Sequence, residues 1–249
     1  MMKNLLVSAL LTVSAISAYG DPLSERMREL EFIESEPPKP GSKEWMKSNH
    51  GDAFIVELKE KFNVRPPKSG ELYSPRVVFD AESVKYIGID NGEFGGGLYI
   101  DVVNKDEKPF FPGNIDTLVP LGDDLYIIEG LAHMGFNGGS VHAIRDYKKP
   151  SRPERITLLP SAPEAVLVDK VYANKQPAIV IAGHDSFMIL IPDRKLLILH
   201  HDTFWGSLYP SSIVRYQEHY VFGIRGGVVA VPVNFWQGSK SFRYFKPKS

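Results

Sequence analysis

The chain has 249 residues, enough for one sizeable hydrophobic core, with 29 Lys and Arg residues against 30 Asp and Glu residues. This near-neutral balance argues against binding to nucleic acid or to an anionic membrane surface. The chain has no cysteine, which excludes structural disulfides, thiol catalysis and metal sites built on thiolates.

Residues 1–20 have the pattern of a secretory signal peptide. Lys3 provides a basic start, residues 5–18 are apolar or small, and Ala18 and Gly20 place small side chains before a cleavage point at Asp21. A buried helix is the alternative. The apolar run is short for a membrane span, and no later stretch offers about 18 consecutive apolar residues. We therefore predict an exported protein, periplasmic or secreted, without membrane insertion.

Residues 21–70 are predicted to form a polar N-terminal arm and linker with one or two short helices. In residues 24–33, apolar side chains recur at three-residue intervals, and Ser24 is a suitable N-cap. Residues 52–62 fit both a strand and one face of a helix, and the good helix formers at 59–61 favour a short amphipathic helix. The Pro- and Gly-containing stretch 65–70 marks the boundary.

Residues 71–249 repeat one strand pattern four times. In each copy an apolar strand runs into a polar loop, often Gly-rich, and a second strand leaves it; the copies are 84–102, 124–144, 178–191 and 219–231. In the second copy we expect the loop at 131–138. First strands are expected before each pair, at 77–79, 115–121, 165–168 and 212–216. Outer strands are expected at 155–158, 196–200 and 242–245.

Short strands with a period near 40 residues are typical of propeller blades, and no helix of about ten residues separates them. The predicted fold is therefore all-β, a small β-propeller with four recognisable blades. A fifth blade that includes the N-terminal segment is one alternative, and a sandwich or jelly roll is another. A four-stranded blade has two apolar faces, which only neighbouring blades can cover. The strand at 242–245 is expected to close the ring by pairing in the blade that begins near Leu72.

Polar residues gather at one end of this predicted propeller, in the loops between second and third strands and at the starts of first strands. The candidate ligand-binding residues are Asp90, Glu93, Glu129, His133, Asn137, His184, Asp185 and Arg225. Each alone fits an ordinary turn residue, but together they would form a concave polar site. Carboxylate and amide oxygens suited to Ca²⁺ make Glu164, Asn114 and Asp116 the candidate metal ligands.

The strand starts Ala162-Pro163-Glu164-Ala165 and Tyr209-Pro210-Ser211-Ser212, with the Gly-Gly-Val and Gly-Leu-Tyr sequences of the third strands, resemble the calcium-dependent propellers of the gluconolactonase, regucalcin and strictosidine-synthase-like superfamily. The resemblance covers the last two thirds of the chain. It implies a propeller fold and a calcium site in which Glu164 matches the family's Glu. Ser211-Ser212 stand where the family has Asn-Gly.

The sequence has no Gly-x-Ser-x-Gly, no Walker loop and no His-Glu-x-x-His motif, so our leading hypothesis is a non-enzymatic exported propeller that binds a small molecule or a protein partner. The alternative is a metal-dependent, lactonase-like hydrolase. In it, His133 or His184 would act as general base on a metal-bound water. The binding hypothesis needs no cofactor, calcium is the candidate metal, and a transition metal held by His133 and His184 on adjacent blades is the alternative.

Overall fold

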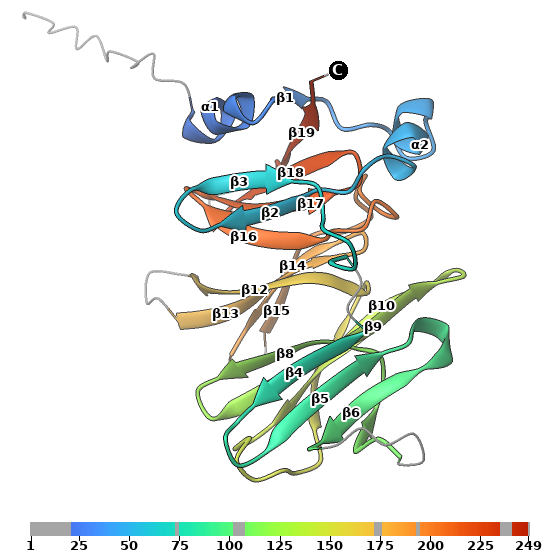
Figure 1. Cartoon of the computed structure of the whole chain (residues 1–249), viewed down its shortest axis with the longest axis vertical. Helices are drawn as coiled ribbons and strands as arrows, with labels where there is room; N and C mark the ends of the chain where they lie inside the picture. The colour runs from blue at the N-terminus through green and yellow to red at the C-terminus, as the bar shows by residue number, and fades with distance from the viewer. Residues whose placement is uncertain are drawn as a thin grey trace, which may run out of the picture.

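The computed structural model describes residues 21–72, 75–101, 108–171, 176–192, 195–234 and 241–248, and it is built mainly of β-strands (Figure 1). The prediction of an all-β chain is confirmed. The predicted signal peptide lies outside the described residues. Among the residues described, no helix is long and apolar enough to span a membrane.

Four larger antiparallel sheets follow one another along the described part of the chain. Their strands lie side by side in sequence order, except that β1 (Phe32–Ser35) joins the fourth sheet beside its last strand. The first sheet contains β4 (Arg76–Asp80), β5 (Lys85–Asp90), β6 (Gly96–Ile100) and β7 (Phe111–Pro112). The second contains β8 (Ile115–Leu121), β9 (Asp124–His133), β10 (Phe136–Ile144) and β11 (Glu154–Leu159). The third contains β12 (Pro163–Val171), β13 (Gln176–Gly183), β14 (Phe187–Ile191) and β15 (Lys195–His200). The fourth contains β16 (Ser212–Tyr216), β17 (His219–Ile224), β18 (Gly227–Pro232) and β19 (Arg243–Pro247).

The repeated strand pattern of the sequence is confirmed, and β8 and β16 have the predicted bounds. The loop predicted at 131–138 is wrong, because β9 and β10 stay paired almost to their tip, with Asn137 opposite Ala132. Only Met134 and Gly135 form the turn, and both have positive φ (47° and 85°). Two such residues suit a tight hairpin, so the Gly and Asn residues nearby do not interrupt pairing.

The N-terminal segment contains α1 (Pro22–Glu29), β1 (Phe32–Ser35), α2 (Lys43–Asn49), β2 (Ile55–Leu58) and β3 (Phe62–Arg65). The side chain of Asp21, and not of Ser24, caps α1 by accepting from the Ser24 amide at 3.1 Å. The helix expected at 52–62 is wrong, because β2 and β3 form a hairpin with buried Val56 opposite buried Val64. Here the alternation of apolar residues, which also fitted a strand, prevailed.

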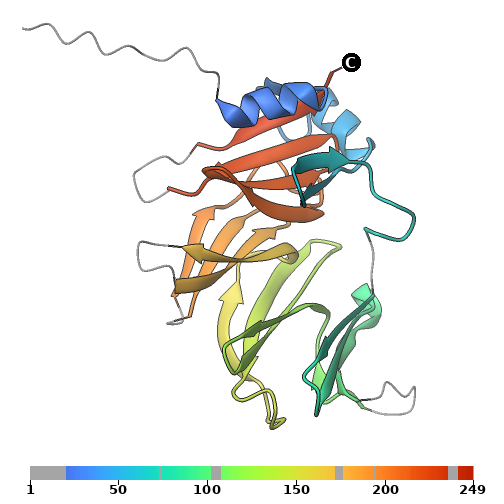
Figure 2. The same ribbon diagram turned by 60° about the vertical axis from the view of Figure 1, so that its left-hand side comes forward.

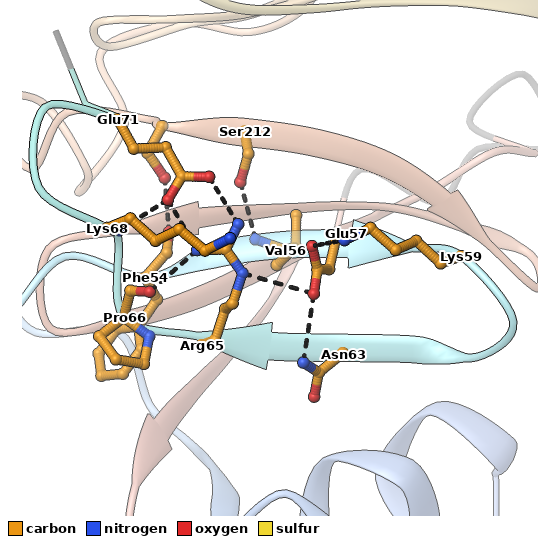
Figure 3. A network of polar contacts seen from close by, with 11 residues as sticks. Phe54, Val56, Glu57, Lys59, Asn63, Arg65, Pro66, Lys68, Glu71 and Ser212 are labelled. Atoms are coloured by element: carbon orange, nitrogen blue, oxygen red, sulfur yellow. Dashed lines mark hydrogen bonds and ion pairs between the residues drawn. The ribbon is translucent and has the colours of Figure 1, made fainter.

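Polar contacts dock this hairpin on the fourth sheet (Figure 3). The Val56 amide donates to Ser212 Oγ at 2.8 Å, beside the start of β16. The Arg65 guanidinium contacts Glu57 at 3.4 Å and holds Glu71 with two hydrogen bonds of 2.6 and 2.7 Å. The hairpin is therefore fixed to the sheet on one side and to the following connection on the other.

The four sheets form an open row. Figures 1 and 2 show the first and fourth sheets at opposite ends of the long axis. Neighbouring sheets contact through their first strands, since β8 touches β4 and β5, β12 touches β8 and β9, and β16 touches β12. The predicted ring closure is wrong, because β19 pairs with β18 and β1 and not with the first sheet.

Apolar clusters fill the spaces between successive sheets. The large side chains of Trp205, Tyr220 and Phe187 are fully buried between the third and fourth sheets. Separate clusters join the first sheet to the second and the second to the third. On the outer face of the fourth sheet, Leu23 of α1 and Phe62 of the hairpin close a further cluster. The central strands of the second, third and fourth sheets are therefore covered by an apolar cluster on each face.

Candidate functional site

A continuous series of contacts joins the turns at one end of the four sheets. We call this the loop end; it comprises the β5–β6, β9–β10, β13–β14 and β17–β18 turns and the connections that lead into β8, β12 and β16. His133 Nε2 lies 2.7 Å from Glu93 Oε2. Further along, the Ala162 amide donates to Asn137 Oδ1 at 2.8 Å, and the Arg225 guanidinium lies 4.4 Å from the centre of the Tyr209 ring. The structure thus places four of the candidate residues at one end of the sheets, namely Glu93, His133, Asn137 and Arg225.

A cleft of about 580 Å³ opens at the loop end, between the tip of β9–β10, the end of β13 and the connection 201–211. Four of the predicted ligand-binding residues line it, namely His133, Asn137, His184 and Asp185. Ser207 and Tyr209, which the sequence analysis did not single out as ligand-binding, also line it. Glu93 contacts His133 but does not line the cleft. Asp90, Glu129 and Arg225 do not line it either.

Two tryptophans hold the connection 201–211 in place. The fully buried Trp205 donates from Nε1 to the Gly183 carbonyl oxygen at 3.3 Å, at the end of β13. Trp45 of α2 donates from Nε1 to the Phe204 carbonyl oxygen at 2.8 Å. Just after these two anchored residues, Ser207 and Tyr209 have φ of 63° and 52°, a region that non-glycine residues seldom occupy. The connection is therefore rigidly anchored and locally strained.

His184, just after β13, lines the cleft and contacts Ser207 on the cleft side and Glu164, which does not line the cleft. Its Nδ1 lies 3.1 Å from Glu164 Oε1, and its Nε2 lies 3.2 Å from the Ser207 amide nitrogen and 3.4 Å from Ser207 Oγ. Because an amide N–H can only donate, Nε2 is the acceptor and Nδ1 carries the proton that Glu164 accepts. The Tyr209 ring meets His184 edge to face at 5.4 Å.

Two polar atoms in the residues that line the cleft are buried without a hydrogen-bond partner, Asp185 Oδ1 and Thr203 Oγ1. The main chain joins the two residues, since the Thr203 amide donates to the Asp185 carbonyl oxygen at 3.1 Å. Buried polar groups are normally paired, and leaving one unpaired costs on the order of 1 to 3 kcal/mol.

Each of the three proposed metal ligands has at least one polar contact, but Asn114 Oδ1, the oxygen that would bind a metal, is buried without a partner among the described residues. Asn114 donates from Nδ2 to the Gly92 carbonyl oxygen at 2.9 Å, while Thr117 donates to Asp116 Oδ2 at 2.6 Å. Burial, with the nearby charges of Glu164 and Asp90, raises the pKa of Asp116 to about 7. Burial also raises the pKa of Glu164, against the hydrogen bond from His184. Within the described part of the chain, no three His, Asp or Glu side chains are grouped to hold a metal ion.

Glu129 belongs to a separate polar group within the second sheet. Ser140 Oγ donates to Glu129 Oε1 and lies 2.8 Å from His142 Nε2. Ser140 is buried, and His142 Nδ1 is buried without a partner. Burial lowers the pKa of His142, so its ring is neutral near pH 7. Neither Glu129, Ser140 nor His142 lines the cleft, so this group lies apart from it.

Comparison with known proteins gives no family for this chain. No family matches the sequence, and no curated protein does so either. Among solved structures, the chain is similar to a computationally designed protein, Ika8, with a TM-score of 0.34 and 11% identity over 77% of this chain and 73% of that chain. A similarity this low supports no conclusion about fold or function.

Proposed function

We propose that this chain is an exported, propeller-like binding module that takes a small polar ligand in the loop-end cleft. The observation that carries the proposal is the pair of buried, unpartnered atoms Asp185 Oδ1 and Thr203 Oγ1 beside that cleft. A carboxylate oxygen accepts hydrogen bonds and a threonine hydroxyl both donates and accepts, so a ligand that carries hydroxyl groups suits both atoms. Its binding would replace the missing partners and recover the cost of leaving these atoms unpaired.

The aromatic residues of the cleft narrow the ligand class. Phe136 and Tyr209 are both exposed, although each has a large apolar ring. A pyranose sugar offers hydroxyl donors on its edge and an apolar face of C–H groups, which suits both kinds of wall. We therefore take sugars as the first ligands to test.

The description as a propeller also belongs to this proposal. It is supported by four successive up-and-down sheets that touch through their first strands, although the row is open. Export is supported by the pattern of residues 1–20. The metal-dependent hydrolase is the second candidate from the sequence. Under the binding proposal, EDTA leaves the melting temperature unchanged, whereas a chelator-sensitive melting temperature would favour calcium and the hydrolase.

Thr203→Val tests the cleft most directly, because it replaces the unpartnered hydroxyl by a methyl group of similar size. Binding of glucose, galactose and N-acetylglucosamine would be followed by saturation-transfer NMR and titration calorimetry. At least one sugar should bind, and Thr203→Val should weaken it about fivefold or more, while leaving the unliganded protein equally or more stable. Asp123→Ala, in the turn between β8 and β9 at the opposite end of the second sheet, is the control. Sugars that do not bind, or that bind the valine variant equally, would overturn the proposal.

A further inference from the structure

Three side chains at the loop end form a line of contacts, from Ser207 through His184 to Glu164. Ser207 Oγ is 3.4 Å from His184 Nε2, and His184 Nδ1 is 3.1 Å from Glu164 Oε1. The three residues come from three different segments, the 201–211 connection, the end of β13 and the start of β12. A hydroxyl, an imidazole and a carboxylate in this order are the nucleophile, the base and the group that orients the base in covalent hydrolases.

The protonation of His184 suits this order. The Ser207 amide donates to Nε2 at 3.2 Å, so the acceptor lone pair of the ring faces Ser207 and is shared by its amide and hydroxyl, while the ring proton faces Glu164. This is the tautomer that a general base requires before it takes a proton from the serine hydroxyl. The distance of 3.4 Å to Oγ is long for a hydrogen bond, as is common before a substrate is bound.

The placement of Ser207 is also unusual. It lies in a tight turn with φ of 63°, and it lines the cleft together with His184. Strained backbone conformations in non-glycine residues gather at functional sites, where the surrounding structure holds them. Here the buried Trp205 and the Trp45 hydrogen bond hold the turn. Ser207 is thus presented to the cleft by a rigid support.

We propose that the cleft cleaves carboxylic esters, with Ser207 as nucleophile, His184 as general base and Glu164 as the residue that positions His184. This inference rests on the proposed function, since it takes the bound ligand to be an acylated polyol. No metal is needed for the reaction.

The steps balance without a further reactant except water. Ser207 Oγ forms a bond to the ester carbonyl carbon while its proton passes to His184 Nε2. The carbon–oxygen bond to the alcohol then breaks, and the alcohol leaves with the proton from Nε2. Water next attacks the acyl-serine and gives its proton to Nε2. The bond to Ser207 breaks, Oγ takes that proton, and the carboxylic acid is released.

The chain contains an internal comparison for this proposal. Ser140 also contacts an imidazole, at 2.8 Å from His142 Nε2. Ser140 is buried, however, and His142 Nδ1 has no partner among the described residues. A second serine–histidine contact therefore exists that lacks both access and an orienting carboxylate. It should not react.

A fluorophosphonate probe, which forms a bond to activated serines, tests the proposal. The full protein would be treated with the probe, and labelling would be read by intact mass and by peptide mapping. We expect one label, on Ser207, and hydrolysis of p-nitrophenyl acetate. Ser207→Gly suits the positive φ and removes only the hydroxymethyl group, so it should keep the fold and lose both labelling and hydrolysis.

Two further variants separate catalysis from structure. His184→Gln should slow labelling at least about a hundredfold. Glu164→Gln should slow it at least about tenfold without changing the melting temperature by much, and Glu164→Asp should restore part of the rate, which a merely structural role would not require. Ser140→Ala, the matched control, should label like the unaltered protein.

Absence of a label on Ser207, or equal labelling of Ser207→Gly, would overturn the proposed esterase activity. That result is distinguishable from failure of the binding proposal. Sugar binding without labelling leaves a binding module with no esterase activity. Labelling of Ser207 without sugar binding supports the triad and rejects only the acylated polyol as the ligand.

Discussion

Asp116 shows how the loop end concentrates negative charge. It lies in β8, where burial raises its pKa. The nearby negative charges of Glu164 and Asp90 raise it further. Its pKa of about 7 compares with 3.8 for the free side chain. The folded protein therefore holds the Asp116 proton more tightly than the unfolded chain. Its contribution to stability is full below about pH 4 and is lost as the pH rises through about 7.

Asp116→Asn should remove the free-energy cost of ionising this buried carboxyl group. The amide oxygen of Asn can still accept the Thr117 hydrogen bond, while the charge is gone. We expect the variant to be more stable than the unaltered protein by on the order of 2 kcal/mol at about pH 8, with the difference vanishing towards about pH 4. Urea denaturation at several pH values measures it. Asp123→Asn, at an exposed position in the turn before β9, is the matched control and should show no such trend. A gain in the stability of Asp116→Asn that does not depend on pH would contradict the raised pKa of Asp116.

At the scale of elements, the hairpin of β2 and β3 joins the fourth sheet through main-chain contacts. The Phe54 amide donates to the Ile224 carbonyl oxygen at 3.2 Å, and Ser211 Oγ donates to the Phe54 carbonyl oxygen at 2.5 Å. The backbone at Phe54 lies directly over Gly223 of β17, where an added Cβ would overlap the Phe54 carbonyl oxygen. Glycine is needed here because two backbones approach closely.

Gly223→Ala should therefore push the hairpin off the sheet. We expect a loss of at least about 2 kcal/mol in the free energy of unfolding, and faster hydrogen exchange at Phe54 and Val56. Gly138→Ala is the control, because the nearest atom to its added Cβ is 3.6 Å away, in ordinary contact with the Phe136 ring. If Gly223→Ala is as stable as Gly138→Ala, the close approach is not a determinant of docking.

At the scale of the whole molecule, the N-terminal segment covers the last edge of the row of sheets. β1 pairs along β19, and Arg243 of β19 contacts Asp21 at 2.5 Å and Glu34 at 2.5 and 2.8 Å. Leu23 and Met27 of α1 are fully buried beside Phe245. An open row of sheets has free strand edges, and an uncovered edge is prone to pair with another chain.

A variant that lacks residues 1–35 should expose this edge. Compared with a variant that lacks only residues 1–20, it should unfold at a lower temperature and self-associate as concentration rises, because β19 loses its outer partner β1 and the α1 side of the apolar cluster opens. Size-exclusion chromatography with light scattering measures the association. Equal mass and equal melting temperature for the two variants would show that the segment is dispensable.

The local sequence pattern by itself determined where the strands of the four sheets lie along the chain. Apolar residues alternate or run together over five to ten positions in β8, β9, β16 and β17, and that information lies within each strand, so the repeats could be predicted without tertiary structure. The gathering of His133, Asn137, His184 and Asp185 at one end followed from the same repeat, since equivalent turns lie on the same side. Their part in binding stays a prediction.

Only the tertiary structure decided what depends on contacts between distant residues. The segment 52–62 has both periods, and docking over Gly223 selects the strand. Pairing of β19 with β1, more than 200 residues away, leaves the row open, although the sequence suggested a closed ring. The Ser207–His184–Glu164 line has no local motif, because its three residues lie 20 or more positions apart and meet only when Trp205 anchors its loop beside β13. Such meetings are set by packing between elements, which a local pattern does not contain.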